Sequence, residues 1–182
     1  MPNTFEVGIL QTAEIAELLD LQRANLAINL DAQTIDSQGF VTFVYAPEAI
    51  KNMMEKAPQI VARADGKIVG YALTTTVESG LDNELMRPLV ELAHTLGPLS
   101  KKPFYFMGQV CVRAGYRGIG IFDALYQEHK DLFKYQFKAV VTEIASDNLR
   151  SLAAHRRVGF DTIHTEFDEK HGKEWQVVAW FF

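Results

Sequence analysis

The sequence has little cysteine, no long apolar run and no excess of positive charge. Cys111 is the only cysteine among 182 residues, which excludes an internal disulfide framework and favours a reducing, cytoplasmic setting. No apolar stretch is long enough to span a membrane, and the first ten residues lack the pattern of a secretory signal. A formal net charge of -5 with no basic stripe argues against nucleic-acid binding. We therefore expect a cytoplasmic protein that binds neither membranes nor nucleic acids.

The remaining composition is typical of one globular domain covering residues 1–182, with 48% hydrophobic and 23% charged residues. Alternating and helical apolar patterns predict a mixed α+β fold, a twisted and mostly antiparallel sheet with helices on both faces. Asp65-Gly66 and His171-Gly172 mark hairpin turns. The seven expected strands cover residues 5–10, 59–64, 67–76, 104–112, 138–145, 161–167 and 174–181. The expected helices cover residues 12–29, 47–56, 81–96, 118–134 and 148–158, with Thr12 as an N-cap and Gly159 as a C-cap.

The most informative stretch is residues 110–122, where an apolar strand meets a basic, glycine-containing loop that leads into an amphipathic helix. Glycines allow a tight turn and a close approach by a ligand, and a helix N-terminus presents free N–H groups to an anion. The loop fits neither the G-x-G-x-x-G dinucleotide pattern, because residue 123 is Asp, nor the P-loop pattern. It therefore indicates either a phosphate-binding site or a plain strand-to-helix turn.

A second feature is a polar row on the helix expected at 148–158. Asn148, Ser151 and His155 have the spacing i, i+3, i+7 and so share one face. Leu149, Leu152 and Ala153 lie on another face and are expected to pack. The polar row suits contact with an extended ligand, or it is a solvated helix face.

Together these residues resemble the GNAT family of acyl-CoA-dependent N-acetyltransferases. Arg117 and Gly120 match the family's Arg/Gln-x-x-Gly-x-Gly/Ala motif, although Phe122 stands where a small residue is usual. The family's next helix, Asn-x-x-Ala/Ser followed by Tyr or His and then Gly-Phe, is matched in order. The matching residues are Asn148, Ser151, His155, Gly159 and Phe160. The order of elements resembles the family fold from Phe5 to Phe182.

The resemblance implies direct acetyl transfer from acetyl-CoA to a primary amine on a small molecule or a peptide. The pantetheine arm would lie between two splayed strands and pair with the backbone of Val110 and Val112, and an N–H near Val112 would polarise the thioester carbonyl. Asn148 and Ser151 would contact the cofactor near its arm. The whole cofactor-binding stretch comprises Val110, Cys111, Val112, Arg117, Gly118, Ile119, Gly120, Ile121 and Phe122, with the pyrophosphate on the amides after residue 117.

The resemblance leaves the catalytic groups open. His155 replaces the tyrosine that protonates the departing thiolate in many members, and it is either that acid or a binding contact. Glu143 and Glu78 are the candidate general bases, while Gln109 is a candidate to orient a water. Cys111 is expected to be a small buried apolar residue rather than an acylated nucleophile.

The acceptor site is expected to lie between the connections 79–102 and 31–40. Their acidic balance mildly favours a cationic amine. His164, Glu166, Asp168 and His171 fit no metal-ligand spacing, so we expect surface residues there and no metal. The apolar strand at 175–182 is expected either inside the sheet or against a second subunit, which leaves a homodimer possible. The alternative functions are a non-catalytic acyl-CoA-binding module and a nucleotide-binding regulatory domain.

Overall fold

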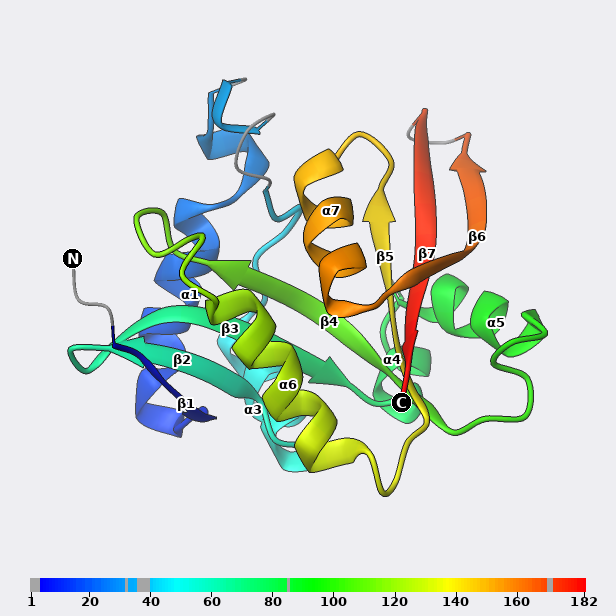
Figure 1. Cartoon of the computed structure of the whole chain (residues 1–182), viewed down its shortest axis with the longest axis horizontal. Coiled ribbons are helices and arrows are strands. Elements are labelled where there is room, and N and C mark those ends of the chain that lie inside the picture. Colours follow the sequence, from blue (N-terminus) through cyan, green and yellow to red (C-terminus); the bar gives the residue numbers. More distant parts are fainter. Residues whose placement is uncertain (1–3, 32, 36–39, 85, 170–171) are drawn as a thin grey trace.

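The computed structural model describes residues 4–31, 33–35, 40–84, 86–169 and 172–182. Its centre is one seven-stranded sheet with strand order β1-β2-β3-β4-β5-β7-β6 (Figure 1). Every neighbouring pair is antiparallel except β4 and β5, which are parallel. The strands are β1 (Glu6–Ile9), β2 (Ile60–Ala64), β3 (Lys67–Thr75), β4 (Phe104–Val112), β5 (Ala139–Ala145), β6 (Asp161–Asp168) and β7 (Lys173–Phe181). The mixed, mostly antiparallel sheet predicted from the sequence is confirmed.

Helices cover both faces of this sheet, as Figure 1 shows. One face packs against α6 (Ile121–Phe133) and α7 (Leu149–Val158). The other face packs against α1 (Ile15–Ala24) and α3 (Pro47–Lys56) at one end, and against α5 (Arg87–Thr95) at the other. The short α4 (Val77–Leu81) precedes α5, and 3₁₀ turns lie at Thr12–Glu14 and Ala27–Asn29. None of the helices in the described part of the chain is long and apolar enough to cross a membrane.

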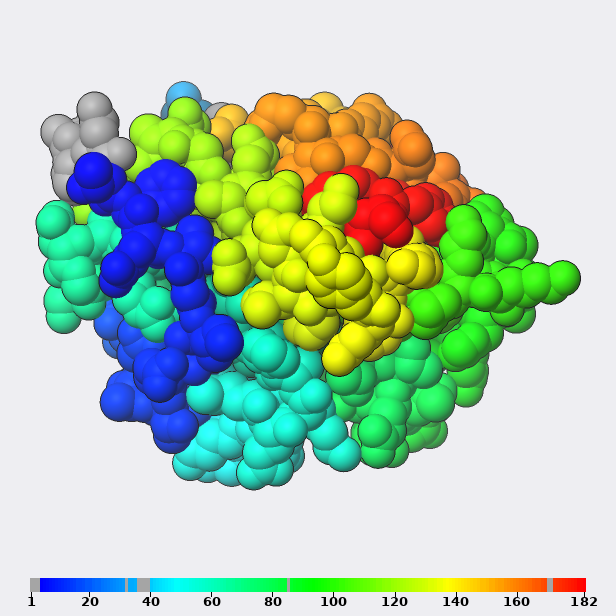
Figure 2. All heavy atoms as spheres, turned by 60° about the horizontal axis from the view of Figure 1, so that its bottom comes forward, coloured from blue at the N-terminus to red at the C-terminus, as the bar shows by residue number. Residues whose placement is uncertain are grey.

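The helix α6 lies close to the sheet because β3 carries Gly70 beneath it. A Cβ at residue 70 would sit 2.9 Å from Cγ2 of Ile121 and 3.3 Å from Cδ1 of Leu125. Beyond α6, Phe182 N donates to Lys138 O at 3.1 Å. Figure 2 shows the end of α6 and the following turn (yellow) lying beside the end of β7 (red). The start of α6 therefore packs closely against β3.

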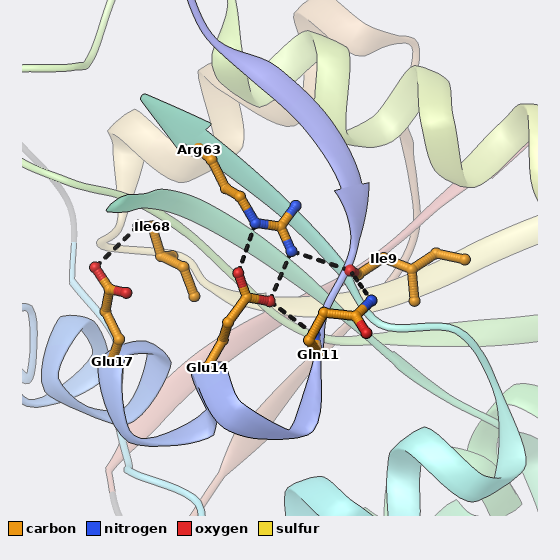
Figure 3. Close-up of polar contacts among 6 residues, drawn as sticks. All are labelled: Ile9, Gln11, Glu14, Glu17, Arg63 and Ile68. Carbon is orange, nitrogen blue, oxygen red and sulfur yellow. Dashed lines mark hydrogen bonds and ion pairs between the residues drawn. The ribbon is translucent and has the colours of Figure 1, made fainter. Parts of the chain in front are cut away.

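The first helix is fastened to the sheet by a partly buried ion pair (Figure 3). Arg63 on β2 donates to both carboxylate oxygens of Glu14 at 2.6 Å, and its Nη2 also donates to Ile9 O at 3.0 Å. The hydrogen bond from Arg63 lowers the pKa of Glu14. Glu17 of α1 accepts from Ile68 N at 3.1 Å, so a carboxylate in the 3₁₀ turn and one in the helix after it bind two strands.

Several predicted element boundaries are corrected. The helix predicted over 12–29 is a 3₁₀ turn followed by α1, which ends at Ala24 because the next residues turn to pair with Val41. The helix predicted over 81–96 begins later, as α5 at Arg87, because Pro88 fits only a first turn. The short α4 before it was not predicted, and Thr76 caps it by accepting from Ser79 N.

Other predictions hold more closely. The Asp65-Gly66 hairpin is confirmed, and both residues have the positive φ, 50° and 70°, that such a turn requires. The closing strands β6 and β7 pair as expected, although His171 in the turn lies outside the described residues. β7 lies inside the sheet between β5 and β6. Of the three α7 residues expected to pack, only Leu152 is buried, whereas Leu149 and Ala153 are exposed, so that expectation was wrong for two of them.

Candidate active site

The sheet opens where its two parallel strands diverge. The pairing between β4 and β5 is limited to Phe104–Phe106 with Ala139–Val141, although β4 continues to Val112 and β5 to Ala145. Figure 1 shows the two strands separating beyond this point. Arg113 N donates to Val69 O of β3, so Arg113 points its main-chain groups toward β3. Because alternate residues of an antiparallel strand point these groups to opposite sides, Val110 and Val112 direct theirs away from β3, toward the opening. The wedge therefore has polar backbone along one side and no strand paired to it.

A glycine-rich turn connects the end of β4 to α6 at the mouth of this wedge. Gly118 and Gly120 have φ values of 81° and 92°, a conformation that other residues adopt only with strain. Gly120 is the N-cap of α6, and no side chain caps this end of the helix. The first N–H groups of an α-helix have no partner within the helix, so this end suits an anion.

Beside the turn lies a cavity of about 450 Å³, here called the wedge cavity. Of the predicted cofactor residues, Ile119 is not among its lining residues, and its side chain is 40% exposed. The other ten line the cavity: Val110, Cys111, Val112, Arg117, Gly118, Gly120, Ile121, Phe122, Asn148 and Ser151. The ring of Phe122 is turned toward the core, where its centroid lies 5.1 Å from those of Tyr126 and His155. The large residue at the motif's small position is thus accommodated.

The wedge cavity is lined by more positive than negative charge. Its basic residues are Arg117, Arg150 and Arg157, and its one described acid is Asp123, which pairs with Arg157 at 2.8 Å. The half-buried Arg117 guanidinium is turned toward protein atoms. Its Nε donates to Val112 O at 2.8 Å, and its Nη2 donates to Oδ1 of Asn25 at 2.6 Å. Arg117 therefore fastens the glycine turn to β4 and to the end of α1.

A second cavity of about 880 Å³, here called the acidic cavity, is lined by both β4 and β5 where the two strands diverge. Its described lining contains no Lys or Arg. It contains four carboxylates, Glu84, Glu143, Glu166 and Asp168, together with the rings of Phe40, Phe43, Phe167 and Trp175. The two cavities share five lining residues, Phe40, Val41, Val110, Asn148 and Ser151. A cavity with basic walls and one with acidic walls therefore meet at the wedge.

Glu143 is the predicted base candidate that lies in the acidic cavity. It is partly buried on β5, where it lines the cavity. Burial, and after it the charges of Glu166 and Asp168, raise the pKa of Glu143 to about 7. A carboxyl group with this pKa is ionised often enough at neutral pH to accept a proton, and strongly enough basic to hold it.

His155 is only 2% exposed, and both of its ring nitrogens are engaged. Nδ1 lies 2.8 Å from Ser151 O, and Nε2 lies 2.7 Å from the hydroxyl of Tyr126. A carbonyl only accepts, so Nδ1 carries the proton and Nε2 accepts from Tyr126. Burial lowers the pKa of His155 to about 4. This arrangement does not favour the acid role, because the proton on Nδ1 is donated to Ser151 O and Nε2 accepts from Tyr126.

The other catalytic candidates are placed less favourably. Glu78 lies on α4 outside both cavities and pairs with Lys56 at 3.3 Å, with 72% of its side chain exposed. Gln109 accepts from the hydroxyl of Tyr71 at 2.6 Å and donates to Phe43 O at 3.0 Å, so it supports the cavity wall. Burial raises the pKa of Cys111 to about 11, which keeps it a neutral thiol, as expected of a buried apolar residue.

Comparison with known proteins agrees with this geometry. The family model described as the acetyltransferase (GNAT) family matches residues 32–160. This chain belongs to the GNAT family. No curated protein sequence matches it.

Solved structures of low sequence identity share the GNAT fold along almost the whole chain. The Escherichia coli ribosomal-protein-S18-alanine N-acetyltransferase is 15% identical, with a TM-score of 0.66 over 98% of this chain and 94% of that one. An acetyltransferase from Salmonella typhimurium, solved with its cofactor acetyl-CoA, is 13% identical, with a TM-score of 0.63 over 97% and 93%. An agmatine N-acetyltransferase is 13% identical, with a TM-score of 0.71 over 98% and 99%. At these identities the likeness establishes the fold alone.

Sequence reasoning missed several residues of this GNAT site. Asn25 and Tyr126, the partners of Arg117 and His155, are not predicted, because no motif contains them. Glu166 and Asp168 were expected to be surface residues, yet they line the acidic cavity beside Glu143. Their alternation along β6 was a usable signal, since it places both carboxylates on one face of a strand that pairs with β7.

Proposed function

We propose that this GNAT chain transfers the acetyl group of acetyl-CoA to a primary amine by direct attack, without an acyl-enzyme. One observation carries the proposal: the wedge cavity and the acidic cavity meet at Val110, Asn148 and Ser151. Members of the family use acetyl-CoA, and the basic cavity with a free helix N-terminus suits a diphosphate. The acidic cavity suits an ammonium ion, and the thioester would be held where the two cavities join.

The residues of the wedge fit this cofactor chemically. The N–H groups of Gly118, Gly120, Ile121 and Phe122 would hold the pyrophosphate, while Val110 would pair with the amides of the pantetheine arm as an added strand. Val112 O already accepts from Arg117, so the N–H of Val112 is the group left to act on the thioester carbonyl. A fixed N–H that stabilises the developing oxyanion is a large catalytic contribution.

Glu143 would act as the general base. An amine enters the acidic cavity as an ammonium ion, which must lose a proton before its nitrogen can attack. Glu143 would accept that proton, and the nitrogen would then bond to the acetyl carbon. As the carbon–sulfur bond breaks, the nitrogen would lose its second proton to solvent and become the amide. The thiolate of CoA is a tolerable leaving group and would take its proton from solvent, since His155 is neutral and engaged.

The experiment measures free thiol release from acetyl-CoA with a panel of primary amines, and the mass of the acetylated product. Thiol release that depends on the amine supports the proposal. Calorimetric binding of CoA without any thiol release would instead indicate the non-catalytic acyl-CoA-binding module. Stabilisation by ATP or NAD but not by CoA would indicate the nucleotide-binding domain.

Two glycine variants test the cofactor site separately. Gly120→Ala places a side chain at a φ of 92° in the glycine turn, and Gly66→Ala places one at a φ of 70° in the remote β2–β3 turn; an added Cβ meets no atom within 4 Å in either. Both variants carry similar backbone strain, so both should lose about 1 kcal/mol of folding stability. Only Gly120→Ala should weaken CoA binding, by about tenfold or more. Equal CoA affinity in the two variants would contradict the proposed pyrophosphate site.

A further inference from the structure

The glycine turn offers little positive charge to a cofactor that carries much negative charge. CoA has three phosphate groups, two in its diphosphate and one on the 3′ oxygen of its ribose. Residues 118–123, which form the turn and the start of α6, include no Lys or Arg, and Asp123 adds a negative charge there. The free N–H groups of a helix N-terminus supply only a partial positive charge. The full positive charges that balance the phosphates must therefore come from other residues of the wedge cavity.

Two of the three arginines that line the wedge cavity are already engaged with protein groups. The Arg117 guanidinium donates to Val112 O and to the side-chain oxygen of Asn25. Arg157 is paired at 2.8 Å with the one acidic residue of the described lining. The third arginine is Arg150, which is exposed and has no hydrogen-bond or ion-pair partner among the described residues. Arg150 is thus the cation that this cavity holds in reserve for an anion.

The position of Arg150 is unfavourable for a cation while no anion is bound. Arg150 is the second residue of α7, in the first turn, where the helix dipole disfavours positive charge. No acidic residue of that turn compensates it. Burial lowers the pKa of Arg117, and the nearby charge of Arg150 lowers it further, so the two guanidinium groups repel each other. An anion beside Arg150 would relieve both effects.

From these observations we propose that Arg150 binds the ribose 3′-phosphate of CoA and makes the site selective for CoA over forms that lack this phosphate. The inference rests on the proposed use of acetyl-CoA and adds the residue that determines cofactor specificity. The 3′-phosphate is on the same ribose as the diphosphate. A diphosphate on the amides of residues 118–122 therefore leaves the 3′-phosphate beside the glycine turn, in the cavity that Arg150 lines. A guanidinium can pair with a phosphate through two parallel N–H groups.

The test compares CoA with 3′-dephospho-CoA, which keeps the diphosphate and the whole pantetheine arm. Each is titrated calorimetrically into the protein without an amine, so no turnover occurs. We expect CoA to bind about tenfold more tightly, because a hydrogen-bonded charge pair is gained. The preference should shrink at high salt, because the pair is exposed to solvent. Equal affinity for the two compounds would overturn the proposal, and an absence of heat from both would overturn the proposed cofactor as well.

Two glutamine variants identify the residue responsible. Arg150→Gln should weaken the binding of CoA alone and leave the two compounds within about twofold of each other. Arg156→Gln is the matched control, because Arg156 is an exposed arginine on the same helix that lines neither cavity. It should retain the full preference for CoA. If Arg150→Gln weakens both compounds equally, Arg150 acts on the diphosphate and the assignment to the 3′-phosphate is wrong.

Folding and acetyl transfer have readouts of their own. Arg150→Gln removes a cation from the first turn of α7, so its thermal midpoint should be no lower than that of the native protein. A loss of CoA preference in this variant therefore reports on binding. Amine-dependent thiol release without a preference for CoA would overturn only this inference. Selective binding of CoA without thiol release from acetyl-CoA, with any amine, would support the role of Arg150 and count against acetyl transfer.

Discussion

Replacing Glu143 by glutamine removes the proposed base while keeping the size and hydrogen-bonding capacity of the side chain. Glu143 lines the acidic cavity, and its pKa is raised to about 7. A positioned general base contributes roughly 10²–10⁴-fold to rate. We expect Glu143→Gln to lower kcat/KM by at least about 100-fold with CoA binding unchanged.

The pH dependence of kcat/KM gives a second quantitative test of Glu143 as the base. With a pKa of about 7, Glu143 is about one-tenth ionised at pH 6 and about nine-tenths ionised at pH 8. An alkyl ammonium stays protonated over this interval, because amines of the lysine type have a pKa near 10.4. The kcat/KM of the native protein should therefore rise about tenfold from pH 6 to pH 8 and then level off. Glu166→Gln removes a negative charge that raises the pKa of Glu143, so it should move this rise to lower pH.

The assay is initial-rate thiol release at fixed acetyl-CoA across this pH range. Glu78→Gln is the matched control, because Glu78 is an exposed glutamate outside both cavities. It should stay within about twofold of the native rate. Our reasoning is refuted if Glu143→Gln behaves like Glu78→Gln, or if the rise with pH persists in Glu143→Gln.

Three further predictions concern stability. Burial holds the pKa of both His129 and His155 at about 4, below the ordinary 6.5, so each stabilises the fold by about 3 kcal/mol near neutral pH, and this stabilisation is lost as pH falls from 6.5 to 4. Urea melts should show the loss most fully in Glu143→Gln, because this variant lacks the opposing stabilisation that the native protein gains when Glu143 is protonated below pH 7. A folding stability that does not change with pH in this variant would contradict the prediction. Gly70→Ala should cost about 1–3 kcal/mol in the same melts, because its Cβ would lie 2.9 Å from Ile121, whereas Gly97→Ala, with open space around it, should cost little. Glu14→Gln should cost about 1 kcal/mol, because it weakens the paired hydrogen bonds from Arg63; an unchanged thermal midpoint would show that this ion pair does not hold the first helix.

The parts of the fold that were predicted depend on local sequence. Asp65-Gly66 forms its turn because both residues adopt positive φ, and the turn before α6 contains glycines where the chain needs the same conformation. Asn148, Ser151 and His155 share a face because helical periodicity fixes their directions. Local patterns of this kind are enough to locate the wedge cavity.

The parts that were not predicted depend on contacts between distant residues. The engagement of the second nitrogen of His155 could not be predicted, because its partner Tyr126 lies on another helix. Arg117 turns inward because Asn25 accepts its hydrogen bond from a position 92 residues earlier. The acidic cavity arises because β7 inserts between β5 and β6, which brings Glu143 and Glu166 onto one face. No spacing in the sequence records this strand order.

The most direct test is a crystal structure of the protein with CoA. We predict the diphosphate within hydrogen-bonding distance of the N–H groups of residues 118–122, with the thiol end between β4 and β5 where the two cavities meet. A CoA molecule bound elsewhere, or with its thiol directed away from Glu143, would contradict this account of acetyl transfer.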